Sequence, residues 1–223
     1  GGFAEAGGKG EDIQERLTAT ANEYGVSVLG PNTSGFLVPG THLYASFASD
    51  VEGIEPGNVA VVSQSGGVAL STAFQAERDG HGLSAMVGLG NRANTGFEET
   101  IDYFDDDPAT EAIAIYIEGT DDARGLLETC RDADTPVVAY KVGREDVGSF
   151  AASHTGALTG DYALYDAGFR QYGVPTVDST TQLFDAARAL ANSPRPTGPN
   201  VALVTAQAGP GIIVTDRLKR AGA

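Results

Sequence analysis

One histidine of this sequence lies in a segment whose composition favours chemistry over packing. His154 belongs to AASHTGALTGDYALYD (151–166), among Ser, Thr and Gly residues. The other two histidines, His42 and His81, lie in unrelated segments without metal-ligand spacing, and there is no GxSxG nucleophile motif. A neutral imidazole can instead accept a phosphoryl group when a carboxylate fixes its tautomer. His154 is therefore either an exposed loop histidine or a phosphoryl carrier.

A second segment has the features of an anion site. In VVSQSGGVALSTAF an apolar run ends at Val62, and a Ser- and Gly-rich turn over 63–67 leads directly into a helical pattern. The first N–H groups of a helix are unpaired and carry partial positive charge, so Ser65, Gly66 and Gly67 are suited to hold a phosphate. The turn lacks the ending of a Walker A loop and the three glycines of a dinucleotide fingerprint. An ordinary Ser N-cap followed by a packing glycine explains it equally well.

Glu118 supplies a carboxylate at the end of the apolar run in IAIYIEGT. A carboxylate at the end of a buried strand is costly unless it is paired, faces water or belongs to a site. Together, His154, Glu118 and the 63–67 turn contain the parts of a phosphoryl-transfer site: a nucleophile, its supporting carboxylate and an anion cradle.

Regular elements must bring these residues together. A helix is expected over 11–24, then a short strand and turn over 26–35. From Pro56 apolar runs alternate with amphipathic segments, and nearly continuous apolar runs indicate a parallel sheet that is covered on both faces. The alternation predicts an α/β fold with a doubly wound parallel sheet, in which ligands bind beyond the carboxyl ends of the strands. Strands are expected over 58–62, 83–91, 112–119, 136–143 and 173–179, and helices over 68–80, 95–107, 123–133, 163–173 and 180–192.

Composition excludes several classes of protein. The net charge of −16, from 30 acidic and 14 basic residues, argues against a general nucleic-acid-binding surface. No apolar run reaches the roughly 18 to 20 residues of a membrane span, and no signal peptide is visible. Cys130 is the only cysteine, so an internal disulfide is excluded and a cytoplasmic protein is expected. The acidic excess, with lysine only at Lys9, Lys141 and Lys219, predicts a halophilic source.

Six motifs together resemble the α-part of the nucleoside-diphosphate-forming acyl-CoA synthetases. The likeness is greatest to the ADP-forming acetyl-CoA synthetase branch and more distant to succinyl-CoA synthetase α. The motifs span most of the chain, in the order of the family, and the SHTGAL portion is the most specific. They are GPNTSG (30–35), VVSQSGG (61–67), GLGNRA (88–93), DDPATEAIAIYIEG (106–119), PVVAYKVGR (136–144) and AASHTGALTGDYALYDAGFRQYGV (151–174).

The resemblance implies a role for each candidate residue. His154 would be the phosphohistidine, Glu118 would hydrogen-bond its imidazole, and the Ser65–Gly67 turn would cradle the phosphoryl group. Asn32 and Asn91 would lie near the acyl and CoA end. The implied reaction converts acyl-CoA, ADP and phosphate into acid, CoA and ATP through an acyl phosphate and phosphohistidine. Mg²⁺ would accompany the nucleotide elsewhere, and no tightly bound cofactor and no metal site are expected in this chain.

The resemblance also implies a flavodoxin-like fold and a domain division. Residues 1–40 would be the tail of a CoA-binding Rossmann domain, 41–192 a flavodoxin-like domain with the phosphohistidine loop, and 193–223 a linker with the first βα unit of a second, truncated subdomain. The chain would thus be a fragment that needs a CoA-binding domain and an ATP-grasp domain or β subunit, and an oligomer is expected. The alternatives are a protein lysine acetyltransferase and a non-catalytic module that senses CoA or nucleotide.

Overall fold

The computed structural model describes residues 1–144, 162–194, 198 and 200–220. The chain divides into two units, Gly1–Asn192 and Ser193–Ala223. The family-implied border at residue 40 stays a prediction, as does the assignment of 1–40 to a preceding domain.

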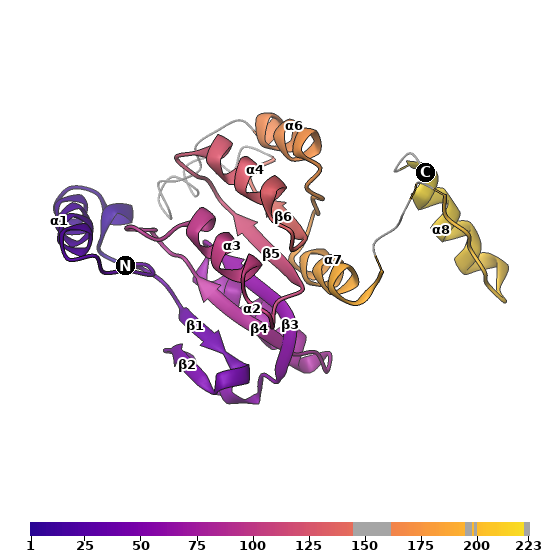
Figure 1. The fold of residues 1–223 in the computed structure, drawn as a ribbon, viewed down its shortest axis with the longest axis horizontal. Helices are drawn as coiled ribbons and strands as arrows, with labels where there is room; N and C mark the ends of the chain where they lie inside the picture. Colours follow the sequence, from indigo (N-terminus) through magenta and orange to yellow (C-terminus); the bar gives the residue numbers. More distant parts are fainter. Residues whose placement is uncertain (145–161, 195–197, 199, 221–223) are drawn as a thin grey trace. The chain divides into compact units, whose positions relative to one another are not determined.

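The first unit is built on one six-stranded sheet with the order β2-β1-β4-β3-β5-β6 (Figure 1). β3, β4, β5 and β6 pair in parallel, whereas β1 is antiparallel to both of its neighbours. The strands are β1 (Gly35–Val38), β2 (Leu43–Ser46), β3 (Pro56–Ser63), β4 (Leu83–Gly88), β5 (Ala112–Ile117) and β6 (Val137–Lys141).

Helices cover both faces of the parallel strands, which explains why those strands are nearly continuous apolar runs. Side chains alternate between two cores: Ala60 and Val62 belong to one, and Val59 and Val61 to the other. The first core is closed by α3 (Phe97–Asp105), α4 (Ala123–Asp132) and α6 (Tyr162–Tyr172). The second is closed by α2 (Gly66–Arg78) and α7 (Thr180–Asn192). The other elements among the described residues of this unit are α1 (Lys9–Glu23) and the 3₁₀ turns η1 (Ala4–Ala6), η2 (Pro39–Thr41) and η3 (Val51–Gly53).

The predicted α/β class and its flavodoxin-like form are confirmed, with corrections to the sheet. The sheet is mixed, because the hairpin of β1 and β2 adds two antiparallel strands next to β4. The short strand expected within 26–35 does not form, and β1 begins only at Gly35. The fifth strand expected over 173–179 is reduced to a single parallel bridge between Ala139 and Thr176. Pro175 cannot donate to a ladder, which limits further pairing there.

The second unit contains α8 (Ala208–Arg220). The strand expected over 201–209 does not form, and α8 begins within this range at Ala208. The apolar side chains of Val204, Ile212 and Ile213 are exposed. Within the described residues of both units, no helix is long and apolar enough to cross a membrane.

Candidate functional site

The strand order places a switch point between β3 and β5. The chain leaves β3 through α2 and returns as β4 on one side, while β5 and β6 extend the sheet on the other side. α2 and α3 consequently pack on opposite faces. In doubly wound sheets this arrangement opens a crevice beyond the carboxyl ends of the two central strands, where ligands bind. The turn over 63–67 follows β3 and Glu118 follows β5, so two of the three predicted parts meet at this crevice.

The turn after β3 has the geometry of a helix start that faces the crevice. Ser65 is the N-cap of α2, and its Oγ accepts a hydrogen bond from the N–H of Val68 at 3.4 Å. Ser63 donates from Oγ to the carbonyl of Ser65 at 2.7 Å and so holds the turn from within. Gly66 and Gly67 form the first turn of α2, where N–H groups have no acceptor inside the helix. The N-cap interpretation and the anion-site interpretation are therefore compatible.

Gln64 connects this turn to Glu118, a link that sequence analysis missed. The side chain is 6% exposed, and its Oε1 accepts hydrogen bonds from the N–H groups of Glu118 at 2.9 Å and Gly119 at 3.1 Å. The backbone N–H of Gln64 donates to the carbonyl of Tyr116 at 3.1 Å. This bond extends the β3–β5 ladder by one residue. The backbone that carries Glu118 is thus fixed relative to the Ser65–Gly67 turn.

Two neighbours define the electrostatics around Glu118. Lys141, at the end of β6, is 5% exposed and its Nζ lies 4.9 Å from the ring centroid of Tyr165. Burial lowers the pKa of Lys141, and the Glu118 charge partly opposes this shift. Burial raises the pKa of Tyr116, and the Glu118 charge adds to that shift. The carboxylate of Glu118 therefore lies within electrostatic reach of a buried cation.

Ser34 is a further candidate that the sequence analysis did not single out. It is 2% exposed, and its Oγ has no hydrogen-bond partner among the residues that the structure describes. A Cβ at Gly66 would lie 2.9 Å from the Ser34 nitrogen, and one at Gly88 would lie 2.7 Å from its Oγ. These two glycines leave the space that Ser34 fills beside the start of α2. Its hydroxyl is a free donor at the edge of the anion cradle.

Asn32 and Asn91 meet in a second cluster at the same edge of the sheet. Asn32 has a left-handed backbone with φ 58°, and its Nδ2 donates to Oδ1 of Asn91 at 3.3 Å. The N–H of Asn91 donates to the carbonyl of Pro31 at 2.9 Å, so the 30–32 turn and the 88–91 loop lie back to back. Thr33 links this cluster to β4 through a hydrogen bond from its Oγ1 to the Gly88 carbonyl. The structure thus brings the two asparagines together, and their place at the acyl and CoA end stays a prediction.

His154 lies outside the described residues, but the described ends of its segment are placed. Arg144, just before the segment, donates from Nη2 to the hydroxyl of Tyr162, just after it, at 2.9 Å. The same nitrogen donates to Oδ1 of Asp178 at 2.9 Å, and the guanidinium lies 4.9 Å from the Tyr162 ring centroid. Both ends therefore meet near the carboxyl end of β6, the strand beside β5.

A cavity of about 400 Å³ lies at the opposite edge of the sheet, away from these residues. Its lining includes Asn58, His81, Arg188 and Asn192. These groups already bond one another: Asn58 donates to Asn192 Oδ1 at 3.2 Å, and Arg188 contacts the His81 ring. The cavity is open but offers no unused donor set, so the carboxyl edge remains the better candidate. Among the described residues, no three His, Cys, Asp or Glu side chains are grouped to hold a metal ion.

Comparison with known proteins defines the class of this fold and site. The profile of the family described as "Succinyl-CoA ligase like flavodoxin domain" matches residues 56–190, which contain the β3–β5 crevice. The chain belongs to this family. The predicted resemblance to the ADP-forming acetyl-CoA synthetases is confirmed by the individual relatives.

The relatives are ligases that act on different acids. The chain is 37% identical to the α subunit of acetate–CoA ligase (ADP-forming) I of Pyrococcus furiosus, over 99% of this chain and 48% of that one. It is 34% identical to 4-hydroxybutyrate–CoA ligase (ADP-forming) of Nitrosopumilus maritimus, over 99% of this chain and 32% of that one. A solved structure of dinucleotide forming acetyl-coenzyme A synthetase 1 of Ca. Korarchaeum cryptofilum, in complex with phosphate and ADP, matches with a TM-score of 0.90. That match has 34% identity and covers 100% of this chain and 48% of the other. The chain therefore spans about half the length, or less, of these relatives.

Proposed function

We propose that this chain is the phosphoryl-transfer core of an ADP-forming acyl-CoA synthetase whose acid is most simply acetate. The observation that carries the proposal is the pairing, at the β3–β5 switch point, of an unpaired helix start with a carboxylate, joined by Gln64. Such a crevice suits a phosphoryl group that must be oriented and neutralised, which is the main requirement of phosphoryl transfer.

Each residue of the crevice has one task in this proposal. Phosphate attacks the thioester carbonyl of acyl-CoA, CoA leaves as the thiol, and an acyl phosphate forms. His154 then attacks phosphorus, the acid leaves as carboxylate, and the phosphohistidine passes its phosphoryl group to ADP. Glu118 stabilises the positive charge that develops on the imidazole. The N–H groups of Gly66 and Gly67, with the Ser65 hydroxyl, neutralise the phosphoryl oxygens.

The ends of the His154 segment support this assignment. Arg144 and Tyr162 fix the points where the segment leaves and rejoins the described fold. β6 pairs with β5, so the segment starts one strand away from Glu118. Substrates would be CoA, phosphate and ADP or ATP, and Mg²⁺ would come with the nucleotide on an ATP-grasp domain or β subunit. A CoA-binding domain would complete the cytoplasmic, oligomeric enzyme.

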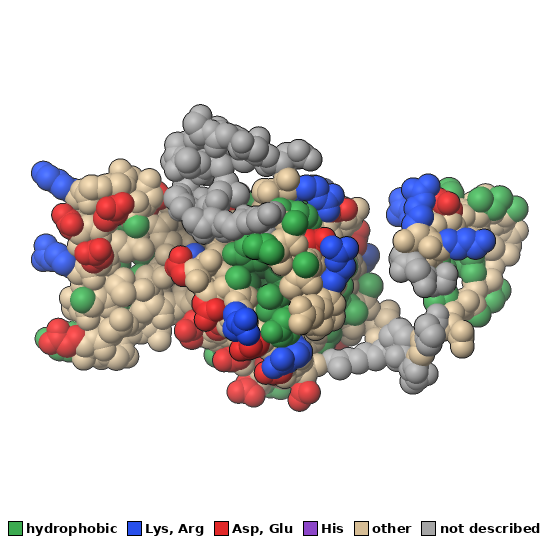
Figure 2. Space-filling model, turned by 90° about the horizontal axis from the view of Figure 1, so that it is seen from above, with side chains coloured by type: hydrophobic (Ala, Val, Ile, Leu, Met, Phe, Trp, Pro, Cys, Tyr) green, Lys and Arg blue, Asp and Glu red, His purple; other side chains and the backbone are tan. Residues whose placement is uncertain are grey.

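We also propose that the protein comes from a halophile. The net charge is −16 and lysine occurs only three times. Figure 2 shows acidic side chains distributed over the visible face rather than gathered in one patch. Distributed negative charge keeps a protein soluble in concentrated salt and destabilises it by self-repulsion when the salt is removed.

The first experiment tests whether His154 carries phosphate. The full-length protein, assembled with its nucleotide-binding part in high salt, is incubated with Mg²⁺ and ATP labelled on its terminal phosphate. We expect acid-labile, base-stable label on the protein and its loss in His154→Asn.

His42→Asn is the matched control, because His42 is exposed and its left-handed backbone, φ 55°, is one that Asn tolerates. If His154→Asn still takes up the label, the phosphoryl carrier is another residue. A protein that takes no label at all would favour a non-catalytic module that senses CoA or nucleotide.

A further inference from the structure

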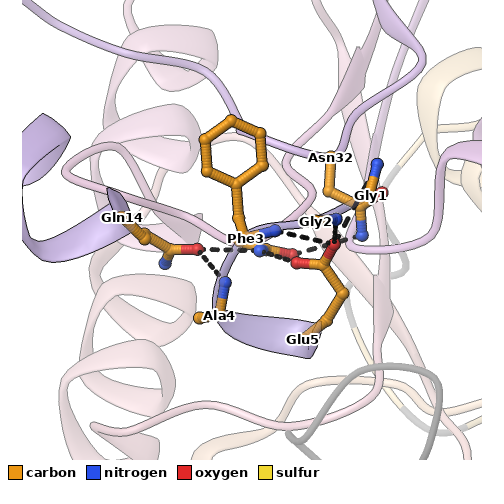
Figure 3. Close-up of polar contacts among 8 residues, drawn as sticks. Gly1, Gly2, Phe3, Ala4, Glu5, Gln14 and Asn32 are labelled. Atoms are coloured by element: carbon orange, nitrogen blue, oxygen red, sulfur yellow. Dashed lines mark hydrogen bonds and ion pairs between the residues drawn. The ribbon is translucent and has the colours of Figure 1, made fainter. Parts of the chain in front are cut away.

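The carboxylate of Glu5 gathers hydrogen bonds from a distant part of the chain. Its Oε1 accepts from the N–H of Gly2 at 2.6 Å and of Phe3 at 3.2 Å. Its Oε2 accepts from Nδ2 of Asn91, which is 86 positions away in the sequence. Figure 3 shows the backbone contacts of Gly2 and Phe3 converging on the carboxylate of Glu5, a residue of η1.

Gln14 completes the surroundings of Asn91. Its Oε1 accepts from Nδ2 of Asn91 at 2.8 Å and from the N–H of Ala4 at 3.2 Å. Both protons of the Asn91 amide are thereby used, one on Glu5 and one on Gln14. A carboxylate only accepts, so Nδ2 must face Glu5 and Oδ1 must face away from it. The orientation of the Asn91 amide is therefore determined by Glu5.

The fixed Asn91 in turn orients Asn32. Oδ1 of Asn91 is presented to Nδ2 of Asn32, 3.3 Å away, so the side-chain oxygen of the exposed Asn32 takes no part in this contact. Among the described side chains and backbone groups, none donates to that oxygen. It is thus left to accept a hydrogen bond from a ligand at this edge.

The charge of Glu5 is maintained by its partners. Burial raises the pKa of this carboxyl, but the hydrogen bonds from Asn91 and from the backbone N–H groups outweigh burial and leave the pKa below its ordinary value. At neutral pH the group is then a pure acceptor, as the orientation of Asn91 requires.

We infer that Glu5 is a positioning residue for the CoA half of the reaction, acting through Asn91 on Asn32. The inference rests on the proposed function, and it assigns to Asn32 the role of accepting a hydrogen bond from an N–H or thiol donor of the CoA substrate. Glu5 touches no reacting atom in this assignment. Its loss should therefore affect CoA use and spare the formation of phosphohistidine from ATP.

The test uses Glu5→Gln in the assembled ligase. The glutamine side chain has the size of the glutamate, but one of its two terminal atoms is an NH₂ donor. That donor must face another donor, either Asn91 Nδ2 or a backbone N–H, so at least one of the present hydrogen bonds is lost. We expect KM for CoA in acyl-CoA formation to rise about tenfold, as the loss of one charge-assisted hydrogen bond would produce. The rate of phosphohistidine labelling from ATP should stay unchanged. Glu15→Gln, an exposed glutamate on α1, is the matched control.

A double-mutant cycle separates positioning from general stabilisation. In an Asn91→Ala background, Glu5→Gln should add nothing to the KM for CoA. Gln14→Ala keeps the helix propensity of α1 and should also raise the KM for CoA, by a smaller factor. It replaces Glu5→Gln in the test if Glu5→Gln does not fold.

The outcomes distinguish this inference from the proposed function. An unlabelled wild-type ligase would overturn the proposed function and this inference with it. Normal labelling together with an unchanged KM for CoA in both the Glu5 and Gln14 variants, or an additive effect of Glu5→Gln on Asn91→Ala, would overturn the positioning role alone.

Discussion

Gln64 shows how one buried amide can hold two parts of a site in register. Its side-chain oxygen accepts two consecutive backbone N–H groups, those of Glu118 and Gly119. Its own backbone sits between the β3 strand end and the N-cap Ser65. Any movement of the YIEG strand end relative to the helix start would break these bonds. The position of Glu118 is therefore set by Gln64 as well as by the sheet.

Replacing Gln64 should measure that contribution. Gln64→Ala leaves two N–H groups without an acceptor in a buried place, and we expect the free energy of unfolding to fall by about 1–3 kcal/mol. Urea unfolding followed by circular dichroism gives the value. Gln182→Ala is the control, because Gln182 is exposed and accepts only the N–H of Asp178, at 3.0 Å. Equal losses in the two variants would contradict the bridging role.

Between elements, the 30–32 turn and the 88–91 loop approach each other closely at the site. Gly90 has φ +55°, and a Cβ there would lie 2.3 Å from the carbonyl oxygen of Pro31. The loop can follow the turn at this distance only because position 90 has no side chain. The same approach brings Asn91 against Asn32.

Gly90→Ala should therefore cost more than backbone strain alone. Gly80 also has positive φ, +73°, but nothing lies within 4 Å of a Cβ there. We expect Gly80→Ala to lower the free energy of unfolding by about 1–2 kcal/mol, and Gly90→Ala to lower it by about 1–3 kcal/mol more through overpacking. Chemical denaturation of both variants tests the difference, and equal losses would mean that the two loops separate without cost.

The elements differ in how far sequence analysis could predict them. The four parallel strands, β3 to β6, were predictable, because strands covered on both faces have uninterrupted apolar sequences. β1 and β2 were missed, because each has four residues and lies toward the edge of the sheet, with partly exposed side chains. Ser65–Gly67 and Glu118 were predictable from strand ends that meet at one edge. Gln64 and Glu5 were not, because their partners lie 54 and 86 positions away and no local pattern encodes such contacts.

For the molecule as a whole, Cys130 is a natural reporter of unfolding. It is the only cysteine, is 6% exposed and lies on α4 against the first core. Burial raises the pKa of its thiol to about 12, and the charge of Glu98 adds to the shift. A thiol that ionises only after unfolding reacts with thiol reagents in the unfolded state and hardly at all in the native fold.

The same shift predicts how stability depends on pH. Because the folded pKa is raised, the contribution of Cys130 is complete below the unfolded pKa, near 9, and is lost as the pH rises toward about 12. Cys130→Ala lacks this group and should be less stable than wild type near pH 7.5, by about 1 kcal/mol. Each pH unit above 9 removes about 1.4 kcal/mol of this contribution from the wild type, so the gap should close and then reverse by about pH 10.5. Urea unfolding at both pH values measures the gap, and a constant gap would show that the thiol does not titrate differently in the two states.

The charge of the whole chain leads to a prediction about salt. The described ion pairs are few and mostly exposed, and most join residues no more than four positions apart, as Arg170 does with Asp166 and Arg220 with Asp216. Such pairs contribute little and leave the excess of acidic residues uncompensated. Their mutual repulsion is weakly screened at low ionic strength and screened within about 3 Å at 1 M salt. The midpoint of unfolding, followed by Cys130 reactivity, should rise steeply with potassium chloride up to about 0.5 M and then level off.

A charge-neutralising variant shows whether repulsion is the cause. Asp106 and Asp121 are exposed, so Asp106→Asn together with Asp121→Asn removes two negative charges with little change in shape. The double variant should be more stable than wild type in dilute buffer, because it lacks part of the repulsion between acidic side chains. At molar salt the two proteins should be equally stable, because salt already screens that repulsion in the wild type. A wild-type midpoint that does not respond to potassium chloride would eliminate the halophile proposal. A stabilisation of the variant that persists at molar salt would point to a local effect of the asparagines instead.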